Sequence, residues 1–258
     1  MRLMKRILSA AAVLALSVSL LVGCSSGTAS SVPVSASSAA ESTVSSVEET
    51  ASSAVDENEA AAAQLLNDLT GSYQELWPVI LADEYKQTWL DDCTALVGED
   101  NAEAAFEKLS SMVTSDVYGE DAVKAYANGG GAYFCGFTNS LAILTFDGET
   151  STISGTDKDG NVLFSHTYHY IGMEPVRGLY EFESDDADSG EFTYFFLAPD
   201  TSAETYHIEF RYGSDADALS QYDAGDYAYW LASGISTDCD QTMIDNCIEL
   251  FCTENLAG

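Results

Sequence analysis

Histidine, basic residues and proline are all scarce in this sequence. Its 258 residues include three histidines, nine lysines and arginines, and four prolines. Three histidines on two segments offer little general acid–base chemistry, and no serine or cysteine stands at a spacing typical of a nucleophile with its base. The sequence therefore argues against an enzyme.

Basic residues are especially scarce beyond the N-terminus. Three of the basic residues (Arg2, Lys5 and Arg6) lie within the first six positions, which leaves six for the rest of the chain against 42 acidic residues. So acidic a surface repels nucleic acid and anionic lipid, and it attracts cations. We therefore expect no nucleic-acid partner. Charge alone does not indicate a cation site, because an acidic surface also keeps a protein soluble.

The CxxC spacing is missing too, although the chain has six cysteines. Its absence argues against the common zinc and redox motifs. One or two disulfides are compatible with a location outside the cytoplasm, but the sequence does not assign them. Buried thiols are the default expectation for the five cysteines that follow the N-terminal region: Cys93, Cys135, Cys239, Cys247 and Cys252.

The N-terminus has the pattern of a bacterial lipoprotein signal. Basic residues precede an apolar run from Ile7 to Val22, which is too short for a mature membrane span. The run leads into LVGC (Leu21 to Cys24), which resembles a lipobox, the pattern that is cut before its cysteine and lipidated there. We expect residues 1–23 to be removed and acyl chains on Cys24 to anchor the protein at the extracytoplasmic face of the cell membrane.

Residues 24–60 are predicted to form a disordered tether. They consist mainly of Ser, Ala, Val, Thr and Glu, with Pro33 as their only proline and no aromatic residue. Such a segment buries too little apolar surface to fold, and a flexible coil of this length spans about 30–35 Å. Every aromatic residue lies beyond it, so residues 61–258 are predicted to form one domain.

The domain is predicted to begin with helices and to continue with strands. An amphipathic helix, broken near Gly71, is expected from Ala61 to around Pro78, because apolar residues recur there at helical spacing. Runs rich in Tyr, Phe, Thr, Val and Ile begin after Gly129. Further helices are expected at 84–97, 101–113, 119–128 and 240–252. Strands are expected near 132–138, 142–146, 152–155, 162–171, 178–183, 191–197, 204–212 and 227–231.

A series of short antiparallel strands predicts a mainly β fold, a barrel or sandwich with flanking helices. The segment DKDGN (Asp157 to Asn161) lies between two of the strands and matches the first half of a calcium loop. However, Tyr168 stands where such a loop needs its glutamate. We therefore predict a hairpin turn at DKDGN.

Four segments of the domain stand out when they are taken in order. They are LTGSYQELWPVI (Leu69–Ile80), YHYIG with VRGLYEFE (Tyr168–Glu183), LAP leading to HIEFRYGSD (Leu197–Asp215), and YAYW (Tyr227–Trp230) before the C-terminal helix. Together they resemble the ZinT (YodA-like) family of extracytoplasmic zinc-binding proteins. The resemblance implies a lipocalin-like (calycin) β-barrel with a helical N-terminal segment and a C-terminal helix, and it implies zinc bound through three histidines.

The resemblance also places the candidate ligands. In the family, one histidine precedes an Ala-Pro pair and two more form a His-x-His strand. Counting back from the glycine that ends the strand puts His207 and Glu209 at the His-x-His positions, and counting back from Ala-Pro puts Phe195 at the earlier one. A gapped alignment would instead put Thr205 and His207 on the pair. Either alignment keeps a single histidine.

Strand geometry places His207 and Glu209 on one face, together with Arg211. An imidazole and a carboxylate side by side suit zinc or another divalent cation. A third ligand must come from an acidic residue, from water, or from one of the two other histidines. His166 and His169 face opposite sides of their own strand, so at most one of them can join His207. We take His169 as the candidate. The competing interpretation is an ordinary polar strand face on which Arg211 pairs with Glu209.

Two functions follow as hypotheses. The first is a membrane-anchored metal-binding lipoprotein that captures zinc or another divalent cation and delivers it to an importer. A carboxylate in place of one histidine makes such a site less selective for zinc. The alternative is a calycin-type small-ligand-binding or scaffold domain that has lost metal binding, which Phe195 in a ligand position favours.

Overall fold

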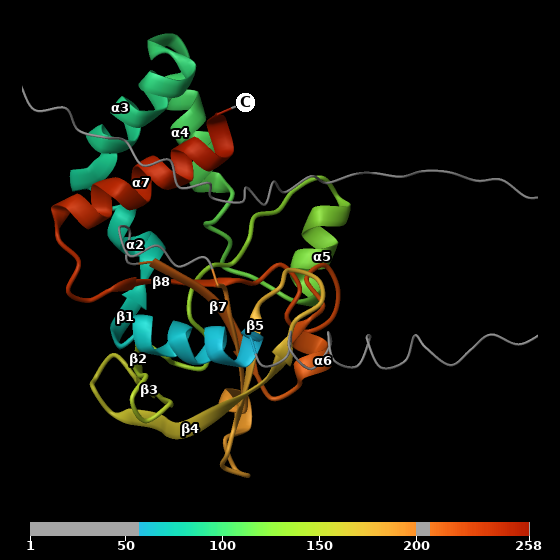
Figure 1. Ribbon diagram of the computed structural model, residues 1–258. Helices are drawn as coiled ribbons and strands as arrows, with labels where there is room; N and C mark the ends of the chain where they lie inside the picture. Colours follow the sequence, from blue (N-terminus) through green and yellow to red (C-terminus); the bar gives the residue numbers. More distant parts are fainter. Residues whose placement is uncertain (1–56, 200–206, 258) are drawn as a thin grey trace, which may run out of the picture. The chain divides into compact units, whose positions relative to one another are not determined.

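The computed structural model describes residues 57–199 and 207–257, all of which belong to one compact unit of the chain. The predicted signal peptide, Cys24 and most of the predicted tether lie outside the described residues. Eight strands close into an antiparallel barrel in which each strand pairs with its neighbours in sequence and β8 pairs with β1 (Figure 1). They are β1 (Gly71–Glu75), β2 (Ile143–Asp147), β3 (Thr152–Thr156), β4 (Val162–Met173), β5 (Tyr180–Ser184), β6 (Tyr194–Leu197), β7 (His207–Gly213) and β8 (Ala232–Ser236).

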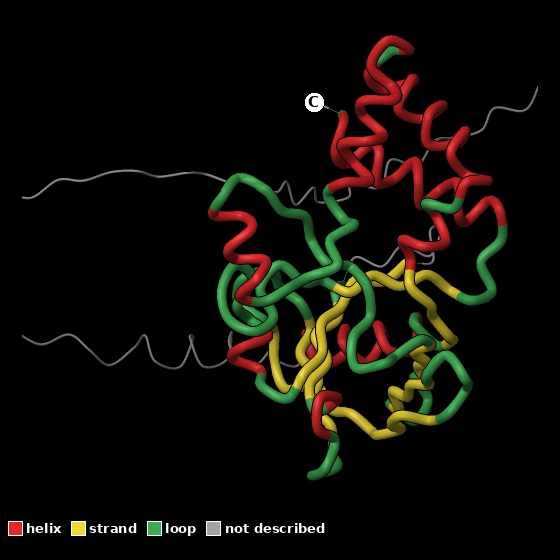
Figure 2. The backbone as a smooth tube through the Cα atoms, turned by 180° about the vertical axis from the view of Figure 1, so that it is seen from behind, coloured by secondary structure: helices red, strands yellow, loops and turns green. Residues whose placement is uncertain are grey.

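Helices flank this barrel. A group of them gathers at one end, where α7 crosses between the barrel and α3 and α4 (Figures 1 and 2). The predicted fold class, a mainly β barrel of lipocalin-like type with flanking helices, is therefore confirmed. The helices are 57–68, α2 (Leu76–Ile80), α3 (Lys86–Val97), α4 (Ala102–Ser111), α5 (Glu120–Ala127), α6 (Ala216–Leu219) and α7 (Gln241–Leu256), with 3-10 turns at Asp83–Tyr85, Glu99–Asn101 and Gly190–Phe192.

Two hydrophobic cores result from this arrangement. The first fills the barrel, and its aromatic rings pack edge to face or stack on one another; for example, the stacked rings of Phe195 and Tyr212 have centroids 5.4 Å apart. The second lies among α2, α3, α4 and α7 and includes Ile235 of β8. These helices form a layer over the outer face of β8. The same helical layer reaches the neighbouring strand β7.

Strand β1 is the largest departure from the predicted secondary structure. The sequence predicts a helix that is broken near Gly71 and stops around Pro78. The helix does end before Gly71, but Gly71–Glu75 is extended and pairs with both β2 and β8. Tertiary pairing outweighs local preference here, because this strand is the one that closes the barrel. Pro78 does not end a helix; it lies in the first turn of α2, where its missing N–H is not needed.

Two other predicted strands are wrong. Residues 132–138 form only isolated bridges through Phe134, and the last strand is β8 at 232–236 rather than 227–231.

Residues 57–60, expected in the tether, belong to the first helix, which packs its apolar side chains against the barrel core. The hairpin turn at DKDGN is confirmed, since the Asp157 N–H donates to the Asn161 carbonyl. Helices α3, α4, α5 and α7 and strands β2 to β7 occur where they were expected, although 204–206 fall outside the described residues.

The N-terminus of α7 is capped by Asp240, whose Oδ1 accepts a 3.0 Å hydrogen bond from the Met243 N–H. Replacing Asp240 with alanine removes this acceptor, so we expect the free energy of unfolding to fall by about 1 kcal/mol. Urea denaturation measures the change. The neighbouring, equally exposed Asp238 does not cap the helix, so Asp238→Ala should change stability by less than about 0.5 kcal/mol. Equal effects of the two substitutions would contradict the capping role.

No helix among the described residues is long and apolar enough to cross a membrane.

Candidate metal-binding site

His207 and Glu209 project outward from the barrel. Between and beside them, Ile208 and Phe210 are almost fully buried and belong to the barrel core, so the alternation of the strand turns His207 and Glu209 to the other face. The prediction that they share one face is confirmed. On the neighbouring strand, His207 lies opposite Ile235, whose side chain packs into the helical core. The two polar side chains therefore face the helical layer rather than open solvent, and both are half-buried.

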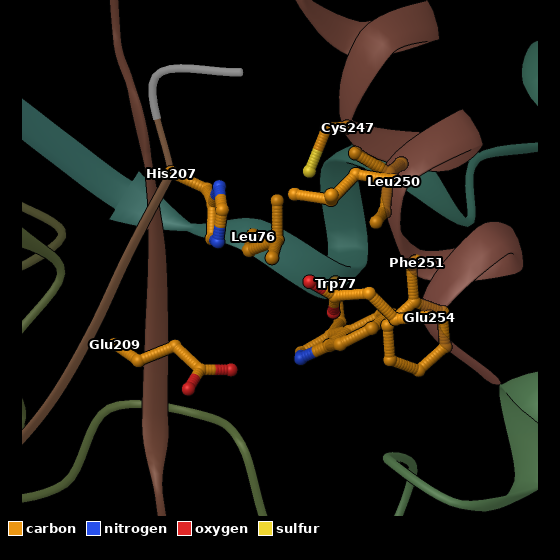
Figure 3. A pocket seen from close by; sticks show the side chains of 9 residues that line it. Leu76, Trp77, His207, Glu209, Cys247, Leu250, Phe251 and Glu254 are labelled. Carbon is orange, nitrogen blue, oxygen red and sulfur yellow. The ribbon is translucent and has the colours of Figure 1, made fainter. Parts of the chain in front are cut away.

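A pocket lies between β7 and that layer (Figure 3). Its cavity is small, about 30 Å³, and is partly open to solvent. Figure 3 shows the carboxylates of Glu209 and Glu254, the imidazole of His207 and the sulfur of Cys247 directed toward the interior of the pocket. The remaining walls are apolar side chains of α2 and α7: Leu76, Trp77, Ile80, Leu250 and Phe251.

Glu254 and Cys247 were not predicted as site residues. They are seven positions apart on α7, which is two helical turns, so the sequence indicates that they share a helix face. What the sequence does not indicate is that this face meets β7, about 40 residues earlier in the chain. That contact depends on the docking of α7 across the end of the barrel.

Two buried cysteines, Cys247 in the pocket wall and Cys135 near Glu209, have raised thiol pKa values. Burial, followed by the negative charge of Glu209, raises the pKa of Cys247 to about 12. The same two causes raise the pKa of Cys135 to about 12. Thiols bind metals as thiolates. Burial and the charge of Glu209 therefore favour the protonated thiol of Cys247.

Trp77 has a weakly used donor at the pocket wall. Its Nε1 is buried and has no well-formed hydrogen bond among the described residues, and its side chain interacts with the thiol of Cys135. Figure 3 shows this nitrogen on the side of the pocket that faces Glu209. A buried N–H without an acceptor costs free energy. The pocket is therefore suited to a bound group that brings an oxygen, such as water or a second carboxylate.

Arg211 does not form the surface pair with Glu209 that the competing interpretation required. Its side chain is fully buried, and the guanidinium donates to the carbonyls of Leu219, Gln221 and Tyr227. It also lies 4.4 Å from the ring centroid of Tyr222. Burial lowers the pKa of Arg211 to about 10, so the group is still charged at pH 7. The guanidinium therefore binds the backbone of the segment that follows β7. The competing interpretation, an exposed polar strand face, is wrong for Arg211.

His169 does not line the pocket. It lies on β4, which is separated from β7 by β5 and β6 around the barrel. The side chain is exposed, and its Nδ1 is 2.7 Å from Oδ1 of Asp185. His166 faces the opposite side of the same strand and its Nδ1 is 2.7 Å from Oδ2 of Asp186. The structure thus brings His207 and Glu209 together but leaves His169 with a different carboxylate.

Phe195, the residue at the position of the third family histidine, points the other way. Its ring is completely buried inside the barrel, within 6 Å of the ring centroids of Phe164, Tyr168 and Tyr212. On the adjacent strand it pairs with Tyr212, which also faces inward. A side chain at position 195 therefore lies on the opposite face of the sheet from His207 and Glu209, so the counted alignment does not define one converging site.

The donor types suit a divalent cation, but the conformation is not a closed coordination sphere. One imidazole and two carboxylates are ligands that zinc accepts at about 2.0–2.2 Å. Among the described residues, no group of three or more His, Cys, Asp or Glu side chains is arranged closely enough to hold a metal. Glu254 is exposed near the end of α7, and glutamate side chains have several rotatable bonds. Coordination by all three residues therefore requires the glutamates to rotate toward His207.

Solved structures that are similar to this chain include the following two. One is the Zn(II)-bound ZinT-like domain of AdcA from Streptococcus pneumoniae, with 14% identity, a TM-score of 0.45, and coverage of 71% of this chain and 89% of that chain. The other is Zn(II)-bound AdcA from the same organism, with 14% identity, a TM-score of 0.43, and coverage of 72% of this chain and 35% of that chain. The match thus spans about a third of AdcA. No protein-family model matches the sequence, and no curated protein matches it.

Proposed function

We propose that this protein binds a divalent metal ion, zinc in the first instance, in the pocket between β7 and α7. The observation that carries the proposal is that His207 and Glu209 leave the barrel side by side and face the same pocket as Glu254 of α7. One nitrogen and two carboxylate oxygens from two packed elements supply a donor set that zinc accepts. A bound water completes the coordination in this proposal.

The surroundings of the pocket support the same conclusion. The chain beyond its first six residues carries 42 acidic residues against six basic ones, so cations are drawn toward it. The buried N–H of Trp77 provides a donor for a metal-bound water or for a ligating carboxylate. Such contacts to the ligands hold them in position and strengthen metal binding. Two carboxylates and one imidazole make the site harder than a three-histidine site, so manganese is expected to compete more effectively.

The setting of this site is part of the proposal. The N-terminal pattern and the lipobox-like LVGC support export and anchoring through Cys24 at the outer face of the cell membrane. A metal-binding domain on a tether outside the cell is suited to collecting a scarce cation. We propose that it captures the ion there and passes it to an importer.

Chelator competition with zinc and the mature chain, Cys24 to Gly258, tests the proposal. We expect a dissociation constant below about 10 μM, which corresponds to about 7 kcal/mol of binding free energy. His207→Ala and Glu209→Gln should each weaken binding by about tenfold or more, because each removes a ligand. Glu254→Gln should weaken it as well, since an amide is a poorer ligand than a carboxylate.

His169→Ala is the matched control, because it removes an exposed histidine that lies outside the pocket. Its affinity should equal that of the unchanged chain. Affinity weaker than about 10 μM in the unchanged chain would contradict metal capture. Equal loss in His169→Ala and His207→Ala would move the site away from the pocket.

The alternative, a barrel that holds a small apolar ligand, finds no support in the barrel interior. The inward-facing rings are in contact with one another, and a ligand would have to displace them. A fluorescent hydrophobic probe tests this alternative. Saturable probe binding that zinc does not affect, in a chain that fails the chelator experiment, would favour it.

A further inference from the structure

Two cysteines that the metal pocket does not use meet in the helical layer. Cys93 of α3 and Cys252 of α7 are both completely buried, and their sulfur atoms are 3.9 Å apart. The two helices pack directly against each other beside the barrel (Figures 1 and 2). A disulfide bond requires about 2.0 Å between sulfurs. The remaining gap of roughly 2 Å is within reach of a side-chain rotation and a small shift of either helix.

The positions of the two cysteines in the chain give such a bond a large effect. Cys93 precedes strand β2 and Cys252 follows strand β8, so a crosslink would enclose β2 to β8, seven of the eight strands of the barrel. A crosslink stabilises mainly by restricting the unfolded chain, and the restriction grows with the length of the enclosed segment. The same crosslink would fix α7, whose other face carries Glu254 and Cys247 at the pocket.

We propose that Cys93 and Cys252 form a disulfide bond when the protein folds on the oxidising, extracytoplasmic side of the membrane. This proposal rests on the predicted export and does not depend on metal binding. The oxidant is a low-molecular-weight or protein disulfide, R–S–S–R. One cysteine thiolate attacks it and releases R–S⁻, and the second thiolate then attacks the mixed disulfide and releases another R–S⁻. Two electrons pass to the oxidant, and the two protons lost by the cysteines protonate the released thiolates.

Burial determines when this reaction takes place. In the folded protein both sulfurs are out of contact with solvent, and desolvation is the largest cause that raises the pKa of each thiol. Few thiolates are therefore present and reagents do not reach them. The bond forms before α3 and α7 have packed, and once formed it is protected from reductants in the folded state.

Peptide mapping of the exported chain is the direct experiment. Free thiols are blocked by alkylation in denaturant at lysis, so that buried thiols react too, and the protein is then cleaved after acidic residues without reduction. Cleavage after Asp92 and Glu99 yields a peptide with Cys93 alone, and cleavage after Glu249 and Glu254 yields one with Cys252 alone. The expected product is these two peptides joined, with a mass lower by two hydrogen atoms than the sum of the free peptides.

Thermal unfolding provides the second readout. Refolding in a buffer of reduced and oxidised glutathione should raise the Tm by about 5–15 °C over refolding with reductant. The increase should vanish in Cys93→Ala and in Cys252→Ala, and it should persist in the matched control Cys247→Ala. Reductant added to the folded, oxidised protein should leave the bond intact.

Peptide mapping tests the disulfide bond even if a variant does not fold, because it uses the unchanged chain. Recovery of both peptides in alkylated form, from the exported chain and from the chain refolded in glutathione, would overturn the proposal. So would a crosslink that joins Cys252 to Cys239 or Cys247 instead.

Discussion

Replacing Arg211 with alanine is expected to lower the free energy of unfolding by about 3–4 kcal/mol. The side chain is fully buried and its guanidinium donates to three backbone carbonyls of the segment that follows β7. Without it, those carbonyls lose a charged donor and a cavity is left against the Tyr222 ring. Hydrogen bonds to charged groups contribute about 1.5–3 kcal/mol, and the cavity adds to the loss. Urea denaturation measures the change.

The location of Arg211 predicts a local effect as well. Amide hydrogen exchange should accelerate first in residues 214–231, because the three acceptor carbonyls belong to that segment. Arg211→Lys should recover only part of the stability, since a lysine ammonium cannot reach three carbonyls with a planar fork. Lys158→Ala serves as a control for the loss of a positive charge, because Lys158 is exposed, and should cost less than about 0.5 kcal/mol. A loss below about 1 kcal/mol for Arg211→Ala would contradict the structural role.

Arg211 also shows the limit of strand alternation as a guide. Alternation predicts correctly which face of the strand a residue occupies, but it does not predict what the residue contacts there. Alternation placed His207, Glu209 and Arg211 on one face, and for His207 and Glu209 the structure confirms it. The surroundings change along the strand: the first two residues meet α7, and Arg211 meets the loop before β8. The competing interpretation, a surface ion pair of Arg211 with Glu209, fails because the sequence does not reveal that this loop folds back over the strand.

The fold itself was predictable where strands carry their own signal. Strands β2 to β7 are rich in branched and aromatic residues and lie between turns, so their pattern suffices. Strand β8 reads ASGIS and has little β preference; it forms because β1 and β7 pair with it on both sides. Strand β1 follows directly after a helix and leads directly into another, and only its partners make it extended. These two strands close the barrel, and both depend on partners far away in sequence.

The candidate site was predictable to the same extent. His207 and Glu209 follow from a local pattern together with a family resemblance, and the structure places both in one pocket. Glu254 lies on a helix whose docking position no local pattern indicates. The prediction of His169 as a third ligand rests on strand geometry. That geometry shows which face of β4 the histidine occupies, but it does not show how far β4 lies from β7 around the barrel.

Introducing histidine at position 195 is expected to destabilise the protein without improving zinc binding. Phe195 is completely buried among aromatic rings inside the barrel, so Phe195→His removes apolar contacts and buries an imidazole without a partner. We expect the free energy of unfolding to fall by about 2–4 kcal/mol in urea denaturation. Zinc affinity of the folded fraction should stay within about twofold, because the new imidazole faces away from the pocket.

Two further variants sharpen this test. Phe195→Leu keeps an apolar side chain, so it separates the loss of the ring from the burial of a polar group and should cost less than Phe195→His. Glu209→His creates a His-x-His strand on the outward face, beside His207 in the pocket. It should tighten zinc binding by about tenfold or more and reduce competition by manganese, because imidazole is the softer ligand. If Phe195→His strengthened zinc binding more than Glu209→His, the metal would lie at the barrel interior rather than between β7 and α7.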